Sequence, residues 1–214
     1  EGIRLYTWNN ITLWNEASKN YILNRDITKK NIIKVLNSHI YYKDSNQELN
    51  LPSFSVAVFL YENHRFNLTN SFLSDWVLSY ATDLYYLNKK FCDDLLFLRE
   101  KYNFSIIVKK KRDFPEKFDY KRNLNFNNWL IKQNKVIQVD NNIAVERIVK
   151  NSEVSISMPF TSPSIIARYL NKKSIYYDPT SLLNSDDPNS SGVEIIKGRD
   201  NLDEFFANFL NKRN

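Results

Sequence analysis

The feature that most constrains the fold is an alternation of two patterns from Ser55 to the end of the chain. Short apolar, β-branched runs alternate with stretches of helical periodicity. Several of the runs are almost continuously hydrophobic, as expected for strands that are covered on both faces of a parallel sheet. The expected strands are Val56–Leu60, Ser105–Val108, Val136–Val139, Val154–Ser157, Ser174–Tyr177 and Val193–Ile196.

The segments between these runs carry helical patterns. A strand–helix–strand rhythm that is repeated this often predicts a doubly wound α/β domain with a parallel sheet. The expected helices are Ser71–Lys101 in one or two pieces, Tyr120–Lys132, Ala144–Lys150, Pro163–Leu170 and Asn201–Leu210.

The first 50 residues follow a different pattern. Ile3–Trp8 and Ile32–Leu36 are expected strands, and Leu13–Leu23 is an expected helix. The polar stretch Asp44–Pro52 is rich in turn formers and is interpreted as a linker. A segment of this length is too short to bury a core of its own. We therefore expect residues 1–50 to pack against the main domain, residues 51–214, or to be the tail of a missing N-terminal domain.

The composition narrows the classes of ligand. A net charge of +6 and a pI of about 9.2 favour an anionic partner such as a phosphate-bearing ligand, a nucleic acid or an acidic membrane surface. A Lys- and Asn-rich composition without any such role is the alternative. The only glycines are Gly2, Gly192 and Gly198, so no Gly-rich phosphate loop is present. Dinucleotide oxidoreductases and P-loop NTPases are therefore disfavoured.

Cysteine and histidine usage excludes several kinds of site. Cys92 is the single cysteine, which rules out an internal disulfide and a Cys-based zinc cluster, and its helical surroundings predict a buried thiol. With only His39 and His64, a multi-histidine metal site is excluded. Neither a membrane-spanning apolar run nor a signal peptide is visible, so the expected location is the cytoplasm. The first residue is Glu1 rather than methionine, which indicates a fragment.

The loop Met158–Ser164 is the leading ligand-binding candidate. Ligands of open parallel sheets bind beyond the carboxyl ends of the strands, and this loop follows an expected strand. Ser162 has the properties of an N-cap, followed by Pro163 at the first helical position. A helix start of this kind offers backbone N–H groups to an anion, and Thr161, Ser162 and Ser164 add hydroxyl groups. An ordinary capped helix is the alternative.

Three other strand ends carry polar side chains. Lys109–Arg112 provides four successive cations, a plausible clamp for phosphate or carboxylate or, alternatively, a solvated charge run. Glu62–Arg65 combines a carboxylate, an imidazole and a guanidinium, although a surface loop is the commoner outcome. In Tyr176–Ser181, aromatic rings could stack on a base or sugar, and Asp178 could hold a hydroxyl group or cap a turn.

Several of these stretches resemble bacterial lipopolysaccharide and capsule biosynthesis proteins that look like GT-B glycosyltransferases. The resemblance covers most of the chain and is most specific in Ser155–Ser162 and Lys173–Pro179, with weaker support from Val56–Tyr61 and Val108–Arg112. It implies a Rossmann-like, doubly wound sheet of the GT-B C-terminal type. The chain would be the donor-binding half of a two-domain enzyme, located in the cytoplasm or peripheral to the inner membrane. Residues 1–50 would then be the end of the N-terminal half and the crossover segment.

The resemblance also implies roles for individual residues. Thr161, Ser162 and Ser164 would contact the donor phosphate, and cations would line the cleft. Base or sugar contacts are expected from Phe160, Tyr177 and Asp178. The loop after the first strand departs from the family pattern, an Asp-containing run that ends in Arg, because only Arg65 matches it. The expected cleft cations are Arg65, Lys109, Lys111 and Arg112.

Three functions follow from these patterns. In the first, a sugar passes from a CMP-, UDP- or GDP-linked donor to a glycan or lipid-linked glycan acceptor, with no bound metal or other cofactor. The fragment would bind the donor without turnover, because the general base could lie in the missing half. The second is a non-catalytic nucleotide- or polyanion-binding module. Nucleic-acid binding is the third and the least favoured, because no aromatic–basic stacking motif is present.

Overall fold

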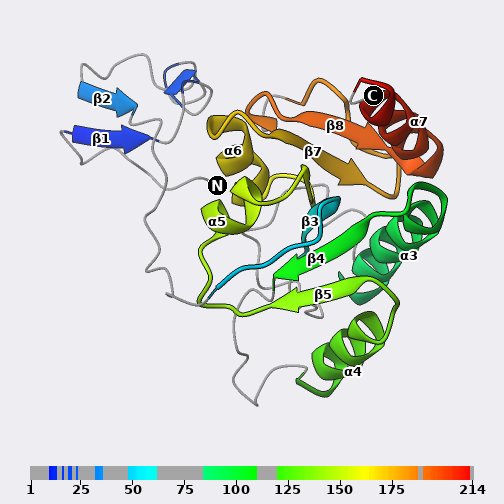
Figure 1. Cartoon of the computed structure of the whole chain (residues 1–214). Coiled ribbons are helices and arrows are strands. Elements are labelled where there is room, and N and C mark those ends of the chain that lie inside the picture. Colours follow the sequence, from blue (N-terminus) through cyan, green and yellow to red (C-terminus); the bar gives the residue numbers. More distant parts are fainter. Residues whose placement is uncertain are drawn as a thin grey trace. The chain divides into compact units, whose positions relative to one another are not determined.

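Six strands pair in parallel as one sheet in the order β5-β4-β3-β6-β7-β8 (Figure 1). This computed structural model describes residues 10–13, 16, 19–20, 23, 32–35, 48–61, 84–109, 120–187 and 190–212. The chain consists of two compact units, Glu1–Tyr42 and Lys43–Asn214. The sheet belongs to the second unit. Its strands are β3 (Ser55–Phe59), β4 (Ser105–Lys109), β5 (Val136–Val139), β6 (Val154–Ser157), β7 (Lys173–Asp178) and β8 (Glu194–Lys197).

Helices cover both faces of this sheet. Figure 1 shows α5 and α6 on one face and α3, α4 and α7 on the other. This two-sided cover explains why every residue of β3 and β6 is buried. The helices are α3 (Leu84–Tyr102), α4 (Tyr120–Ile131), α5 (Val145–Lys150), α6 (Ser162–Tyr169) and α7 (Gly198–Asn211).

Alternate residues of the central strands fill two apolar layers. Val56 and Val58 belong to the larger layer, together with the apolar side chains of α3 and α7. Ala57 and Phe59 point into a smaller layer that includes residues of α5 and α6. Cys92, on α3, is 2% exposed, and burial raises the pKa of its thiol well above the usual value.

The strand and helix predictions for the second unit are confirmed with shifts of a few residues at the ends. A Rossmann-like α/β fold is therefore established for this unit. Helix α3 begins at Leu84, and the earlier part of the expected helix, 71–83, lies outside the described residues. Within the six-stranded sheet, the edge strand β5 is the most exposed, with both Ile137 and Gln138 exposed.

The first unit contains a pair of short parallel strands, β1 (Asn10–Leu13) and β2 (Ile32–Val35). The strand expected at Ile32–Leu36 is confirmed. Strand β1 was not predicted, and the expected strand Ile3–Trp8 lies outside the described residues. Among the described residues of the whole chain, no helix combines the length and apolar character needed to cross a bilayer.

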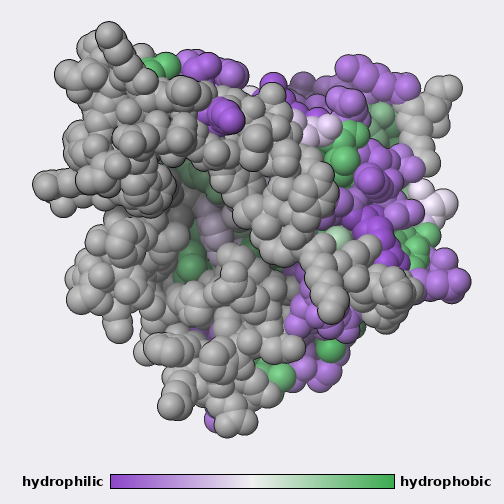
Figure 2. Space-filling model, turned by 90° about the vertical axis from the view of Figure 1, so that its left-hand side faces the viewer, coloured by the Kyte–Doolittle hydropathy of each residue, from purple (hydrophilic) through white to green (hydrophobic). Residues whose placement is uncertain are grey.

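Most of the described surface visible in Figure 2 is hydrophilic, with apolar residues in small, separate patches. The exposed large apolar side chains accordingly come from several elements, among them Tyr86 and Phe97 of α3 and Ile131 of α4.

Candidate functional site

The carboxyl ends of β3 and β6 mark the point at which the strand order reverses. From β3 the chain continues to β4 and β5 on one side, and from β6 it continues to β7 and β8 on the other. The two strands are neighbours, with Phe59 opposite Ser157 at their ends. In doubly wound sheets this reversal point is where ligands bind. The segment that leaves β6 here, Met158–Thr161, is called the β6–α6 loop below.

Hydrogen bonds from two tyrosines hold the β6–α6 loop. The hydroxyl group of Tyr61, just beyond β3, donates to the carbonyl oxygen of Pro159. From β7, Tyr176 donates its hydroxyl proton to the carbonyl oxygen of Thr161 at 2.9 Å. Burial raises the pKa of both phenols, so both remain protonated donors at neutral pH. These two hydrogen bonds fix the loop from within the protein.

Phe160, in the same loop, has a left-handed backbone conformation with φ of 60°. This conformation is unfavourable for a bulky residue and persists only where the surroundings impose it. Here the flanking carbonyl groups of Pro159 and Thr161 are fixed by the tyrosine bonds. The Phe160 ring lies 6.0 Å from the Tyr176 ring and remains partly exposed.

Helix α6 begins one residue earlier than the sequence predicts. Thr161, rather than Ser162, is the N-cap, and its side chain does not cap the helix. The Thr161 Oγ1 hydroxyl instead donates backward to the carbonyl oxygen of Met158 at 2.7 Å. The first backbone N–H groups of a helix have no partner within that helix, and the Thr161 side chain does not cap those of Ser162 and Ser164. They lie at the positive end of the helix dipole.

Buried serine hydroxyls fix the first turn of α6 to the sheet. Ser164 is fully buried, and its Oγ donates to the carbonyl oxygen of Ile175 at 3.0 Å. The same oxygen lies 2.6 Å from Ser157 Oγ, and Ser174 Oγ donates to the Ser164 carbonyl oxygen. The Ser164 hydroxyl, which the sequence assigned to phosphate, is thus occupied inside the protein. Thr161 and Ser162 are partly exposed.

Of the four predicted cations, the structure describes Lys109 alone. Lys109 ends β4 at the same sheet edge, and its ammonium group donates to the carbonyl oxygen of Asn141 at 2.5 Å. Desolvation lowers the pKa of Lys109, and the nearby charge of Asp140 opposes this shift. The other three predicted cations, Arg65, Lys111 and Arg112, lie outside the described residues, as does His64.

Tyr177 and Asp178, which the sequence predicts to contact a base or sugar, also lie inside the protein. Both residues are 0% exposed. The Asp178 carboxylate accepts from the backbone N–H groups of Thr180, Leu182 and Leu183 and from the Thr180 hydroxyl. Asp178 therefore caps the turn after β7, which was one of its two expected roles.

Sequence reasoning did not identify Tyr61, Tyr176 and Ser157 as the residues that fix the loop. In the sequence, only their positions could have indicated this role, because each residue lies at or beside the carboxyl end of an expected strand. Within the described ranges, no group of three or more His, Cys, Asp or Glu side chains is placed to hold a metal ion.

The loop sequence also connects the chain to known proteins. A family model described as "Polysaccharide biosynthesis PFTS motif protein" matches residues 1–206. The letters P-F-T-S stand in this chain as Pro159, Phe160, Thr161 and Ser162. The chain belongs to this polysaccharide biosynthesis family. These four residues span the end of the β6–α6 loop and the first residue of α6. No curated protein matches the chain.

The fold of the chain is also found in a solved structure. A UDP-GlcNAc 2-epimerase from Methanocaldococcus jannaschii is similar with a TM-score of 0.50 and 16% identity, over 95% of this chain and 54% of that chain. A mutant of S. aureus TarM, in complex with Fondaparinux, alpha-GlcNAc-glycerol and UDP, gives a TM-score of 0.49 and 9% identity, over 96% and 38%. The chain thus spans about half of the epimerase chain.

Proposed function

We propose that this chain is the donor-binding domain of a nucleotide-sugar-dependent glycosyltransferase for bacterial surface polysaccharides, such as lipopolysaccharide or capsule. The observation that carries the proposal is the uncapped start of α6 at the point where the strand order reverses. Because the N-cap side chain bonds elsewhere, the first N–H groups of the helix can bind an anion. Membership of a polysaccharide biosynthesis family supports a nucleotide sugar as that anion.

The donor phosphates are proposed to lie against the backbone N–H groups of Ser162 and Ser164. The hydroxyl groups of Thr161 and Ser162 add contacts, and the partly exposed ring of Phe160 contacts the base or sugar. Cations from neighbouring strand ends, among them Lys109, complete the electrostatic environment. Preformed donors of this kind stabilise charge on a departing phosphate without reorganisation, which is worth about 3–4 kcal/mol per donor in enzymes where one was removed.

The proposed site uses no metal and no other cofactor. Phosphate charge would be met by N–H groups and by the predicted cations Arg65, Lys109, Lys111 and Arg112. The acceptor is proposed to be a glycan or lipid-linked glycan. A second domain, outside this chain, would supply the general base. This chain alone is therefore expected to bind donor nucleotide without sugar transfer, in the cytoplasm or at the inner membrane surface.

The proposal is tested by calorimetric titration of the 214-residue chain with UDP, CMP and GDP. One of the three is expected to bind in preference to the others. The Ser162→Pro variant removes one backbone N–H, and the extended conformation of Thr161 (φ −99°, ψ 147°) tolerates a following proline. The affinity is expected to fall about 10-fold, equivalent to about 1.4 kcal/mol.

Ser162→Ala is the matched control, because it removes the hydroxyl group but keeps the N–H. Its affinity is expected to stay within about threefold of the parent chain, equivalent to about 0.7 kcal/mol. Failure of all three nucleotides to bind would overturn the proposal. Equal affinities for the Ser162→Pro and Ser162→Ala variants would show that the Ser162 backbone N–H does not contact the nucleotide.

A further inference from the structure

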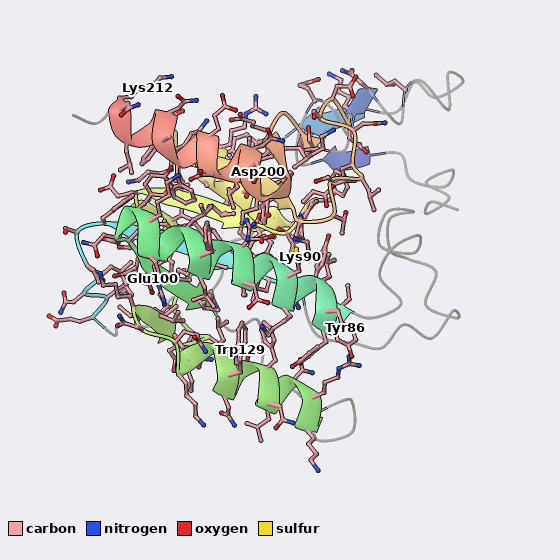
Figure 3. All side chains as sticks on the ribbon, turned by 90° about the vertical axis from the view of Figure 1, so that its right-hand side faces the viewer. Tyr86, Lys90, Glu100, Trp129, Asp200 and Lys212 are labelled. Atoms are coloured by element: carbon pink, nitrogen blue, oxygen red, sulfur yellow. The ribbon has the colours of Figure 1, made fainter. Side chains whose placement is uncertain are left out.

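A hollow lies at the carboxyl ends of β7 and β8. It has a volume of about 450 Å³, within the usual range of ligand sites. Three segments line it: α3, the turn after β7, and the end of β8 with the first turn of α7. Figure 3 labels Lys90 on α3 and Asp200 at the start of α7, on the two helices that flank it. The lining is Lys90, Asp94, Pro179, Ser181, Lys197, Gly198, Arg199, Asp200 and Asn201.

The lining of this pocket, called the β7–β8 pocket below, is almost entirely polar. Among the described residues that line it, Pro179 is the single apolar side chain and none carries an aromatic ring. A nucleobase or lipid chain needs apolar walls, which this lining does not offer. Carboxylates, an amide, a hydroxyl group and cations together provide both acceptors and donors. That mixture fits a ligand rich in hydroxyl groups, each of which donates and accepts.

One carboxylate in the pocket is buried and held in a fixed position. The Asp94 side chain is 7% exposed. Its Oδ2 accepts from Lys90 Nζ at 3.0 Å and from the hydroxyl group of Tyr177 at 2.7 Å. Neither bond uses Oδ1, so this second oxygen is left to accept from a ligand. A buried carboxylate is costly unless its hydrogen bonds are made, and a ligand hydroxyl group would complete the set.

The charges of the pocket favour an anionic ligand. Lys90 and Asp94 form an ion pair and offset each other. Within the described lining, Lys197 and Arg199 face a single remaining carboxylate, that of Asp200, which also stabilises the start of α7. The Arg199 guanidinium lies over the Phe97 ring of α3, 4.7 Å from its centre. These lining residues therefore carry an excess of positive charge.

We propose that the β7–β8 pocket binds one sugar unit that carries a carboxylate or phosphate group. Asp94 Oδ1 accepts a hydrogen bond from a sugar hydroxyl group, and Lys197 and Arg199 bind the anionic group. Assigning this sugar to the glycan being built rests on the proposed function; the binding itself does not. Strands β6, β7 and β8 are neighbours, so the pocket lies on the same sheet edge as the β6–α6 loop.

Tyr177 is a positioning residue for this pocket. Its ring is fully buried against Phe91, at a centroid distance of 5.2 Å, and only its hydroxyl group reaches Asp94. It acts through the carboxylate, which it holds in one orientation. Replacing it with phenylalanine keeps the ring and removes this hold.

The test is a chemical-shift titration of the 214-residue chain with D-glucuronate, with D-glucose in a parallel titration and UDP as the independent nucleotide probe. Glucuronate is expected to bind at least about 10-fold more tightly than glucose, the effect of about one charged hydrogen bond. The Lys197→Gln variant is expected to weaken glucuronate binding about 10-fold and to leave glucose binding unchanged. Tyr177→Phe is expected to weaken the binding of both sugars by roughly three- to 10-fold while UDP binding stays unchanged.

Lys132→Gln is the control for net charge, because Lys132 is exposed just beyond α4 and does not line the pocket. It is expected to change glucuronate affinity by less than about twofold, and the amide spectrum of each variant checks its fold. Three results would overturn the proposal: no saturable binding of glucuronate, equal affinities for glucuronate and glucose, or an equal loss in Lys132→Gln and Lys197→Gln. Absence of UDP binding alone would contradict only the proposed function.

Discussion

The ends of β6 and β7 lie side by side at one edge of the sheet and carry the two stretches on which the predicted family resemblance chiefly rests, yet they are built differently. After β6, the backbone turns out of the sheet at Phe160, and Thr161 and Ser162 remain partly exposed. At the end of β7, Tyr176, Tyr177 and Asp178 are fully buried. The first end leaves the start of α6 without a side-chain cap, and the second supplies the hydrogen bonds that hold its surroundings.

This difference shows what the position of a residue at a strand end implies. The rule that ligands bind at carboxyl ends selects an edge of the sheet. It does not say whether a side chain there points to the ligand, because a strand covered on both faces buries its last side chains as well as its first. The hydroxyl groups of Tyr176 and Tyr177 accordingly donate inward, to the Thr161 carbonyl and the Asp94 carboxylate.

The largest expected effect is on the free energy of unfolding, and it differs between the two strand ends. Replacing Tyr177 with alanine removes a fully buried ring and is expected to lower the free energy of unfolding by about 3–5 kcal/mol. Phe160→Ala, in the partly exposed loop, is expected to cost less than half as much. Urea denaturation of both variants measures the two costs. A larger cost for Phe160→Ala would contradict the division of roles.

Asp178 provides the next largest effect. Asp178→Ala leaves the buried N–H group of Leu183 and the neighbouring turn without an acceptor, and an unsatisfied buried group costs about 1–3 kcal/mol. We expect a loss of about 3 kcal/mol in the free energy of unfolding, with nucleotide affinity unchanged. The exposed Asp186 is the matched control, and Asp186→Ala is expected to cost less than about 0.5 kcal/mol. Weaker nucleotide binding in folded Asp178→Ala would instead place this carboxylate in the donor site.

Alkaline pH provides a smaller and graded effect on the end of β7. Burial raises the pKa of Tyr177 above the value of about 10 for an unfolded tyrosine. Its contribution to stability is therefore fully present below about pH 10 and declines above it, because the unfolded chain releases a proton that the folded chain retains. The decline reaches about 1.4 kcal/mol per pH unit for each such phenol.

Urea denaturation between about pH 8 and pH 11 measures this slope. The unfolding free energy of Tyr177→Phe is expected to fall less steeply with pH than that of the parent chain. The two slopes are expected to differ by up to the release of one proton. Because Tyr61, Tyr176 and Cys92 also have raised pKa values, the comparison between the two chains isolates the contribution of Tyr177. Equal slopes in the two chains would show that the phenol ionises normally.

The smallest expected effect sharpens the comparison at the loop itself. Thr161→Val keeps the shape of the side chain but removes its hydrogen bond to the Met158 carbonyl oxygen, at an expected cost of about 1 kcal/mol. Its nucleotide affinity is expected to fall, by less than about 10-fold. Thr180→Val removes a comparable hydroxyl group after β7 and is expected to leave nucleotide affinity unchanged. Calorimetric titration distinguishes the two variants, and equal losses would contradict the assignment.

Local patterns were sufficient to predict the strands and helices of the second unit, because each apolar run or helical periodicity lies within a few residues. The same holds for the loop Met158–Ser164, whose position follows from the strand before it. The hydrogen bonds that give the site its form join distant residues. Tyr61 and Pro159 are 98 positions apart, and Tyr177 and Asp94 are 83 apart. No local pattern encodes such a pair, so the inward direction of these hydroxyl groups required the structure.

The buried thiol of Cys92 has a consequence for kinetics. A thiol reacts with alkylating reagents as its thiolate, and both burial and the raised pKa suppress that form while α3 is packed on the sheet. Cys92 is the only cysteine of the chain. The rate at which a reagent modifies it therefore measures how often α3 separates from the core, without an added label. A ligand that bridges α3 and α7 is expected to slow this reaction.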